Sequence, residues 1–150
     1  MEKLPPIEKI PEAWSAIADE RVVFEADNTA SVDSSDRTKR YSVHWEENVY
    51  AADDSATVWA GYPGYPVLAV LMKQGILPLD MEIAEMFQNV NWKELNTRFR
   101  RKYDEALAFV IQERGLDAKR VHAAMEAVYA ALETMDLEIR RYRKGKKKTT

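Results

Sequence analysis

The chain has 150 residues, of which 46% are hydrophobic and 31% charged, and its formal net charge is −3. This length and balance are typical of one soluble globular domain. The sequence contains no cysteine, which excludes disulfides, thiol catalysis and cysteine-ligated zinc or iron–sulfur sites. No apolar run approaches the roughly 20 residues that span a bilayer, and no apolar block typical of a secretory signal begins the chain. We therefore expect a cytoplasmic protein without a membrane partner.

The charge is unevenly distributed along the chain. The last eleven residues, RRYRKGKKKTT, carry seven basic groups and no acid. The other 139 residues hold 15 basic and 25 acidic groups, a net of −10. We expect a single domain over 1–143, β-rich over 20–60 and helical over 64–143, followed by a disordered basic tail over 144–150.

The first half of the chain predicts one helix and a small sheet. Pro11 suits the first position of a helix near 11–19, because a proline there loses no needed N–H. Short β-rich runs follow at 21–25 and 30–33, and the run at 41–46 alternates apolar and polar residues. A tight turn then leads to a partner strand at 49–51. The pattern predicts an antiparallel meander of three or four strands.

Residues 59–66 read WAGYPGYP, which crowds glycine, proline and aromatic residues together. Proline and glycine at the second and third positions of residues 62–65 are typical of a type II turn, in which Gly64 has a positive φ. Pro63 and Pro66 lack N–H donors, so the stretch does not suit a phosphate-binding loop. We expect a rigid turn into a helix over 66–74, with Tyr62 and Tyr65 as candidates for an aromatic contact with a partner.

The segment over 25–75 resembles a SWIM domain that lacks all four zinc ligands. In that family a β-hairpin precedes two ligand pairs and a helix that begins much like VLAVLM here. The matching ligand positions are Ser55, Thr57, Gly64 and Pro66, and these side chains offer zinc no thiolate or imidazole. The resemblance implies a ββα core held by aromatic packing in place of a metal. It also implies contacts with DNA or protein.

Cap residues divide the second half into helices. Gly75 ends the helix over 66–74, and Asp80 caps a helix over 81–88. Asn91 and Gly115 enclose a long helix over 92–114, and Asp117 caps a last helix over 118–143. The predicted fold class is α+β, a small antiparallel meander followed by about four helices. The last two helices are expected to form a long antiparallel hairpin.

The last predicted helix carries the most regular apolar pattern in the chain, with members spaced alternately four and three apart. Its members are Val121, Met125, Val128, Leu132, Met135, Ile139 and Tyr142. Such a stripe packs within one chain or across a two-fold axis, and the sequence leaves both open. The leading functional expectation is a non-catalytic interaction module that forms a homodimer or binds another protein.

An enzyme is the first alternative. His44 and Glu46 share one strand face, and Asp53 and Asp54 follow in the next loop. Such a cluster suits Mg²⁺ or Mn²⁺, or general acid–base work. No local motif fixes its geometry, so the leading expectation includes no catalytic residue, no metal and no cofactor.

A nucleic-acid-associated protein is the second alternative. Its candidate contacts lie on one side of the predicted helix over 92–114 and in the C-terminal tail. They are Arg98, Arg101, Lys102, Arg140, Arg141, Arg143 and Lys144. Phosphate contacts by such groups add salt-dependent affinity. The acidic body opposes non-specific binding, so the basic tail is the part that would bind nucleic acid.

Overall fold

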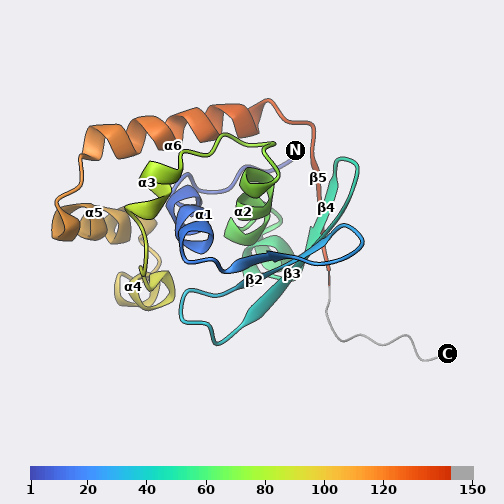
Figure 1. Cartoon of the computed structure of the whole chain (residues 1–150), viewed down its shortest axis with the longest axis horizontal. Helices are drawn as coiled ribbons and strands as arrows, with labels where there is room; N and C mark the ends of the chain where they lie inside the picture. The colour runs from blue at the N-terminus through green and yellow to red at the C-terminus, as the bar shows by residue number, and fades with distance from the viewer. Residues whose placement is uncertain (143–150) are drawn as a thin grey trace.

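The computed structural model describes residues 1–142 and has the α+β fold that the sequence predicts (Figure 1). The first half holds α1 (Lys9–Ala18), β1 (Val22–Phe24), β2 (Thr29–Asp33), β3 (Arg40–Glu46), β4 (Val49–Ala52) and the π-helix η1 (Ala56–Ala60). The second half holds α2 (Tyr65–Lys73), α3 (Met81–Glu85), α4 (Trp92–Arg98), α5 (Tyr103–Arg114), α6 (Ala118–Glu133) and β5 (Glu138–Arg141). Among these helices, none combines the length and apolar character that a membrane crossing requires.

The sheet contains the predicted meander. Strands β1 to β4 pair antiparallel in chain order, and Val43 lies opposite both Ala30 and Ala52. Because side chains alternate across a strand, these three residues share one face, and all are fully buried. The opposite face carries polar residues, among them Thr29 and His44.

Helices cover the apolar face of the sheet in layers. In Figure 1, α1 and α2 lie beside the sheet, and α6 runs across the far side of α1. The core of α2, residues 67–72, is buried on all sides. In α1 the Ser15 hydroxyl donates to the Phe87 carbonyl at 2.6 Å and accepts from Trp92 Nε1 at 2.8 Å. These bonds tie the segment between α3 and α4 to the centre of the molecule.

Several predicted helix ends are confirmed. The side chains of Asp80, Asn91 and Asp117 accept backbone N–H groups at the starts of α3, α4 and α6. Gly75 and Gly115 follow α2 and α5 with φ values of 79° and 63°. Such left-handed positions favour glycine.

The predicted long helix over 92–114 is interrupted. Arg100 and Arg101 have φ values of 54° and 63°, which ends α4 and lets the chain turn into α5. The Phe99 and Phe109 rings, 5.6 Å apart, pack together across this turn. No glycine or proline marks the break, and the apolar residues keep their helical spacing across it. The sequence pattern therefore does not reveal the break.

The last helix is also shorter than predicted, because the chain leaves it after Glu133 and enters β5. There Ile139 lies beside Tyr50, and β5 pairs parallel with β4. The Asn48 amide donates to the Asp136 carbonyl at 2.8 Å and guides the chain to this edge. The spacing of Met135 and Ile139 fits a helix, yet the two residues lie beyond it and are partly buried.

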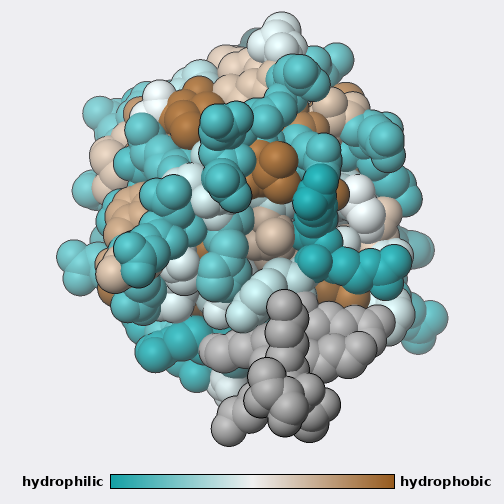
Figure 2. Space-filling view, turned by 90° about the vertical axis from the view of Figure 1, so that its right-hand side faces the viewer, coloured by the Kyte–Doolittle hydropathy of each residue, from teal (hydrophilic) through white to brown (hydrophobic). Residues whose placement is uncertain are grey.

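The apolar stripe of α6 packs within the single chain. Val121, Met125, Val128 and Leu132 are at most 4% exposed. The Tyr129 hydroxyl donates to the Pro5 carbonyl at 2.8 Å, so α6 covers the N-terminal segment. The homodimer stays a prediction, and these four buried side chains offer it no surface. Figure 2, viewed from the right-hand side of Figure 1, shows apolar residues as separate spots among polar ones.

The turn before α2 differs from the type II prediction. Gly64 has a φ of −73° and caps α2 in an extended conformation, and the positive φ lies at Gly61, which ends η1. The need for glycine at 64 is steric, because a Cβ there would overlap the buried carboxylate of Asp54. The Gly64 N–H donates to the Thr57 hydroxyl, which donates to Asp54 Oδ1 at 2.8 Å. This chain of bonds joins η1 to α2.

We predict that Gly64→Ala destabilises the fold by about 1–3 kcal/mol, the usual cost of forcing an extra group into a packed site. Equilibrium denaturation with urea measures the loss. In an Asp54→Ala background the same substitution is expected to cost less, because the overlapping carboxylate is gone. Asp53→Ala serves as the matched control background. Equal costs in all three backgrounds would contradict the steric explanation.

Candidate anion-binding pocket

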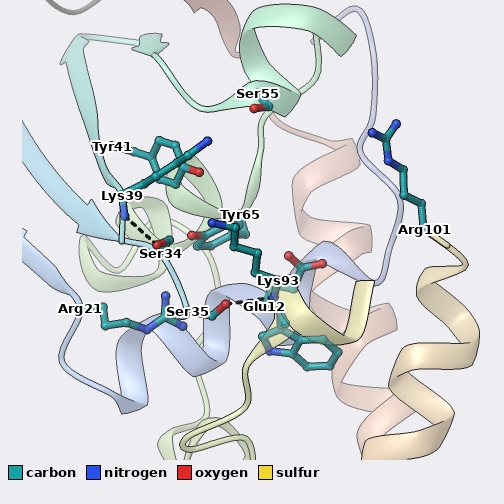
Figure 3. Close-up of a pocket in the computed structure, with 11 residues that line it drawn as sticks. Glu12, Arg21, Ser34, Ser35, Lys39, Tyr41, Ser55, Tyr65, Lys93 and Arg101 are labelled. Carbon is teal, nitrogen blue, oxygen red and sulfur yellow. Dashed lines mark hydrogen bonds between the residues drawn. The ribbon is translucent and has the colours of Figure 1, made fainter. Parts of the chain in front are cut away.

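A pocket of about 350 Å³ opens where α1, the β2–β3 turn, α2 and α4 meet (Figure 3). Segments far apart in the sequence contribute to it. Its lining residues are Glu12, Arg21, Ser34, Ser35, Lys39, Tyr41, Ser55, Tyr65, Trp92, Lys93 and Arg101. Figure 3 shows Arg21 and Arg101 on opposite sides of the view, with Tyr65 between them.

Arg21 is the buried cation of the pocket wall. Its backbone leaves α1 and enters the sheet, since its N–H donates to the Ala16 carbonyl and its carbonyl accepts from the Asp33 N–H. The residue is 2% exposed. Its Nη1 donates to the Asp33 carbonyl at 2.7 Å, and its Nε lies 3.7 Å from Asp19. Nε and Nη2 have no hydrogen-bond partner among the described residues. A guanidinium with unmet donors in a buried place favours an added acceptor.

The β2–β3 turn is held rigid beside Arg21. Asp36 Oδ1 accepts from the Ser34 hydroxyl and from both the hydroxyl and the N–H of Thr38. The hydrogen bonds from Thr38, followed by the bond from Ser34, hold the pKa of Asp36 well below its ordinary value of 3.8. The turn therefore presents Lys39 and the serine hydroxyls in fixed positions.

The same turn is fastened to α4. The Lys93 N–H donates to the Ser35 hydroxyl at 3.0 Å, and the Lys93 ammonium lies 3.2 Å from Asp36. The Ser35 hydroxyl in turn donates to the Asn91 side chain. Lys93 thus reaches the pocket from a helix whose position depends on the turn.

Two tyrosines supply neutral hydroxyl groups to the pocket. The rings of Tyr41 and Tyr65 meet edge to face at 6.4 Å. Burial raises the pKa of Tyr65 well above its ordinary value of 10.0, and the nearby charge of Arg21 opposes this shift. Burial, and after it the charge of Asp54, raises the pKa of Tyr41. Both hydroxyls stay protonated near neutral pH and can donate hydrogen bonds.

The charge of the pocket lining is positive, in contrast to the acidic body. Four basic side chains line it, and Glu12 is the one acid among the described lining residues. Glu12 is already engaged, because it lies 3.3 Å from the Lys9 ammonium and accepts from Asn96. Burial disfavours the charge of Lys9, yet the combined effects of Glu12, Tyr103 and Tyr62 outweigh it and the pKa of Lys9 is raised. The arrangement suits a small anion such as phosphate or carboxylate.

The residues of the metal or acid–base alternative have separate partners. His44 Nδ1 lies 3.2 Å from the Thr29 hydroxyl, and the His44 ring stacks on Tyr142 at 4.2 Å. Asp53 accepts from the Ser42 N–H, while Asp54 is buried under Gly64 and its pKa is raised by burial. Glu46 is exposed. Within residues 1–142 no group of three or more His, Asp or Glu side chains could hold a metal.

The residues of the nucleic-acid alternative are distributed over two regions. Arg98 lies over the Phe109 ring at 4.6 Å, and Lys102 pairs with Glu105. Of the predicted helix-face cations, Arg101 lines the pocket. In the C-terminal region, Arg140 and Arg141 belong to β5 and are exposed, with Arg140 paired to Glu138. Arg143 and Lys144 lie outside the described residues.

The two tyrosines that the sequence suggests for contact with a partner lie in different places. Tyr65 lines the pocket, while Tyr62 is half-buried with the Lys3 ammonium 5.7 Å from its ring centre. Sequence reasoning missed Arg21, Lys39 and Lys93. Arg21 follows Asp19 and Glu20 directly before the β-rich run VVF, so it looks like one member of a charged turn. No local signal distinguishes it as the buried member of that run.

The sequence model of one protein family matches residues 2–138. The chain belongs to this family, described as uncharacterised conserved protein UCP014422. No curated protein and no solved structure matches the chain. All lining residues of the pocket lie inside the range that matches UCP014422, whereas Arg140 and Arg141 lie beyond it. The SWIM resemblance stays a prediction.

We predict that Asp36→Asn lowers the thermal midpoint near pH 7, because the neutral amide accepts weaker hydrogen bonds from Thr38 and Ser34 and loses the ion pair with Lys93. The pKa of Asp36 is depressed in the folded state, so its stabilisation is present above 3.8 and is lost as the pH falls further. The difference in midpoint between wild type and variant is therefore expected to narrow below pH 3.8. Calorimetry over a pH series measures this. Asp27→Asn, at an exposed turn, is the control, and a difference that stays constant with pH would contradict the assignment.

Proposed function

We propose that the protein binds a small anionic ligand, bearing a phosphate or carboxylate group, in the pocket between α1, the β2–β3 turn, α2 and α4. The observation that carries this proposal is the buried guanidinium of Arg21. It lines the pocket while its Nε and Nη2 lack partners among the described residues. A buried charge with unmet donors costs stability, and an anion at this wall offsets that cost.

The rest of the lining supports the same ligand chemistry. Lys39 and Arg101 are exposed and form no ion pair with residues 1–142, so their charges are available to a ligand. Tyr41 and Tyr65 add neutral donors, and Trp92 adds an apolar surface. A positive pocket in an acidic protein also favours the local capture of anions over binding to a long polyanion. This small-molecule binding role differs from the leading expectation from the sequence, which is an interaction module that forms a homodimer or binds another protein.

We predict that inorganic phosphate binds the pocket at low ionic strength and that Lys39→Ala weakens this binding about tenfold, or about 1.4 kcal/mol. Isothermal titration calorimetry gives the affinity at which phosphate binds. Added sodium chloride is expected to weaken binding through screening.

Lys119→Ala is the matched control, because Lys119 is exposed at the start of α6, outside the pocket. The control is expected to bind like wild type. Equal losses in both variants would show only a non-specific effect of charge. No phosphate binding by the wild-type protein would overturn the proposal.

A second role, contact with another copy of the chain, is supported by Trp59. This side chain is 77% exposed, more than any other large apolar side chain in residues 1–142. It lies on η1, next to Gly61 and the half-buried Tyr62. Exposed tryptophans are characteristic of contact surfaces.

We predict a dimer at micromolar concentration that Trp59→Ser converts to a monomer, as measured by light scattering. Ile76→Ser is the control, since Ile76 is a second exposed apolar residue, 46% exposed, after α2. A monomeric wild-type protein would contradict this role and leave the anion pocket unaffected.

A further inference from the structure

A second cationic cavity adjoins the pocket. Its volume is about 520 Å³, and it shares Lys93 and Arg101 with the pocket. Its other lining residues include Arg100, Lys9 and Tyr103, and no acid is among the described residues that line it. We call these two neighbouring cavities together the cationic groove; Lys93 and Arg101 line both of its halves.

The Arg100–Arg101 turn has a backbone that arginine does not favour. Arg100 and Arg101 have φ values of 54° and 63°. The Arg101 N–H donates to the Asn96 carbonyl at 2.7 Å, and the Arg100 N–H donates to the Thr97 carbonyl at 3.1 Å. This bonding pattern is a Schellman motif, in which glycine is preferred at the position of Arg100. Two side chains with a Cβ in the left-handed region therefore reduce the stability of the fold.

Contacts within the protein do not explain the two arginines. Both are exposed. Their neighbours form ion pairs, Arg98 with Glu94 and Lys102 with Glu105, whereas Arg100 and Arg101 pair with no acid in residues 1–142. A turn that has arginine where glycine is more stable, beside a second cavity whose described lining residues include no acid, is suited to an anionic ligand.

We propose that the Arg100–Arg101 turn binds a second phosphoryl group of the ligand, so that the groove accepts a compound with two linked phosphoryl groups. This inference rests on the proposed anion pocket, where the terminal phosphoryl group lies near Arg21 and Lys39. Arg101 and Lys93 contact the bridge between the groups, and Arg100 contacts the second. Planar guanidinium groups match phosphoryl oxygens with paired hydrogen bonds.

The groove favours a small diphosphate over a nucleic-acid strand. Arg21 is 2% exposed, so the inner half of the groove offers its guanidinium to one small group and not to an extended chain. A continuous strand instead needs an open track of cations and aromatic platforms along its length. Nucleic acid is therefore the competing ligand, and the test includes it.

The full chain is titrated with inorganic phosphate, inorganic pyrophosphate and a short single-stranded DNA without terminal phosphates. Pyrophosphate is expected to bind about tenfold tighter than phosphate. Arg100→Gly is expected to remove this preference and to change the phosphate affinity less than about twofold, because Arg100 lines only the second cavity. The same variant is expected to raise the melting temperature by about 2–4 °C, since glycine suits the left-handed turn.

Two control variants separate charge and backbone effects. Arg141→Ala removes a charge from the exposed strand β5, and Asn89→Gly places glycine at another left-handed position, with a φ of 58°. Both residues lie outside both cavities, and both variants are expected to keep the preference for pyrophosphate. Lys39→Ala alters only the first pocket and is expected to weaken both anions equally.

The outcomes distinguish the two proposals. Phosphate binding without a preference for pyrophosphate overturns this inference and leaves the anion pocket standing. No binding of either anion overturns both. DNA that binds as tightly as pyrophosphate, with the same dependence on Arg100, assigns the groove to nucleic acid instead. An Arg100→Gly variant that melts lower and keeps the preference assigns Arg100 a structural role.

Discussion

The burial of α1 on every side is the constraint on which the rest of the structure depends. Residues 9–17 of this helix are all buried, including its polar members Lys9, Glu12 and Ser15. Buried polar groups must find partners within the protein. Ser15 finds them in the segment before α4 and in Trp92, and Glu12 finds them in Lys9 and Asn96. These hydrogen bonds from the buried polar residues of α1 fix the position of α4, which forms one wall of the pocket.

Much of the fold is predictable from local sequence rules. The strand β3 and the caps at Asp80, Asn91 and Asp117 depend on residues close in the chain, and the structure confirms them. The break at Arg100 is formed by local hydrogen bonds at two left-handed arginines, whereas the strand β5 depends on its distant partner β4. Helical spacing passes through both places, so no local signal opposes the longer helices.

The candidate site is less predictable than the fold, because it assembles turn residues from separate parts of the chain. Arg101 and Tyr65 carry sequence signals, an arginine cluster and an aromatic turn, but those signals point to other roles. The role proposed for Arg21 can be recognised only from the structure, which shows that the residue is buried and that two of its nitrogens have no partner among the described residues. Gly64 illustrates the same limit. Its glycine signature suggests backbone freedom, whereas the actual requirement is the space taken by Asp54.

The parallel pairing of β5 with β4 also orders the events of folding. Strand β4 is made early, but the strand that covers its edge comes only after α6. During synthesis on the ribosome, the N–H and C=O groups along that edge are left unpaired while the helical half emerges. An unpaired edge is a template for strands of other chains, and such long-range pairing is slow to form. In a nascent chain the β4 edge is therefore open to pairing with strands of other chains until β5 has been made.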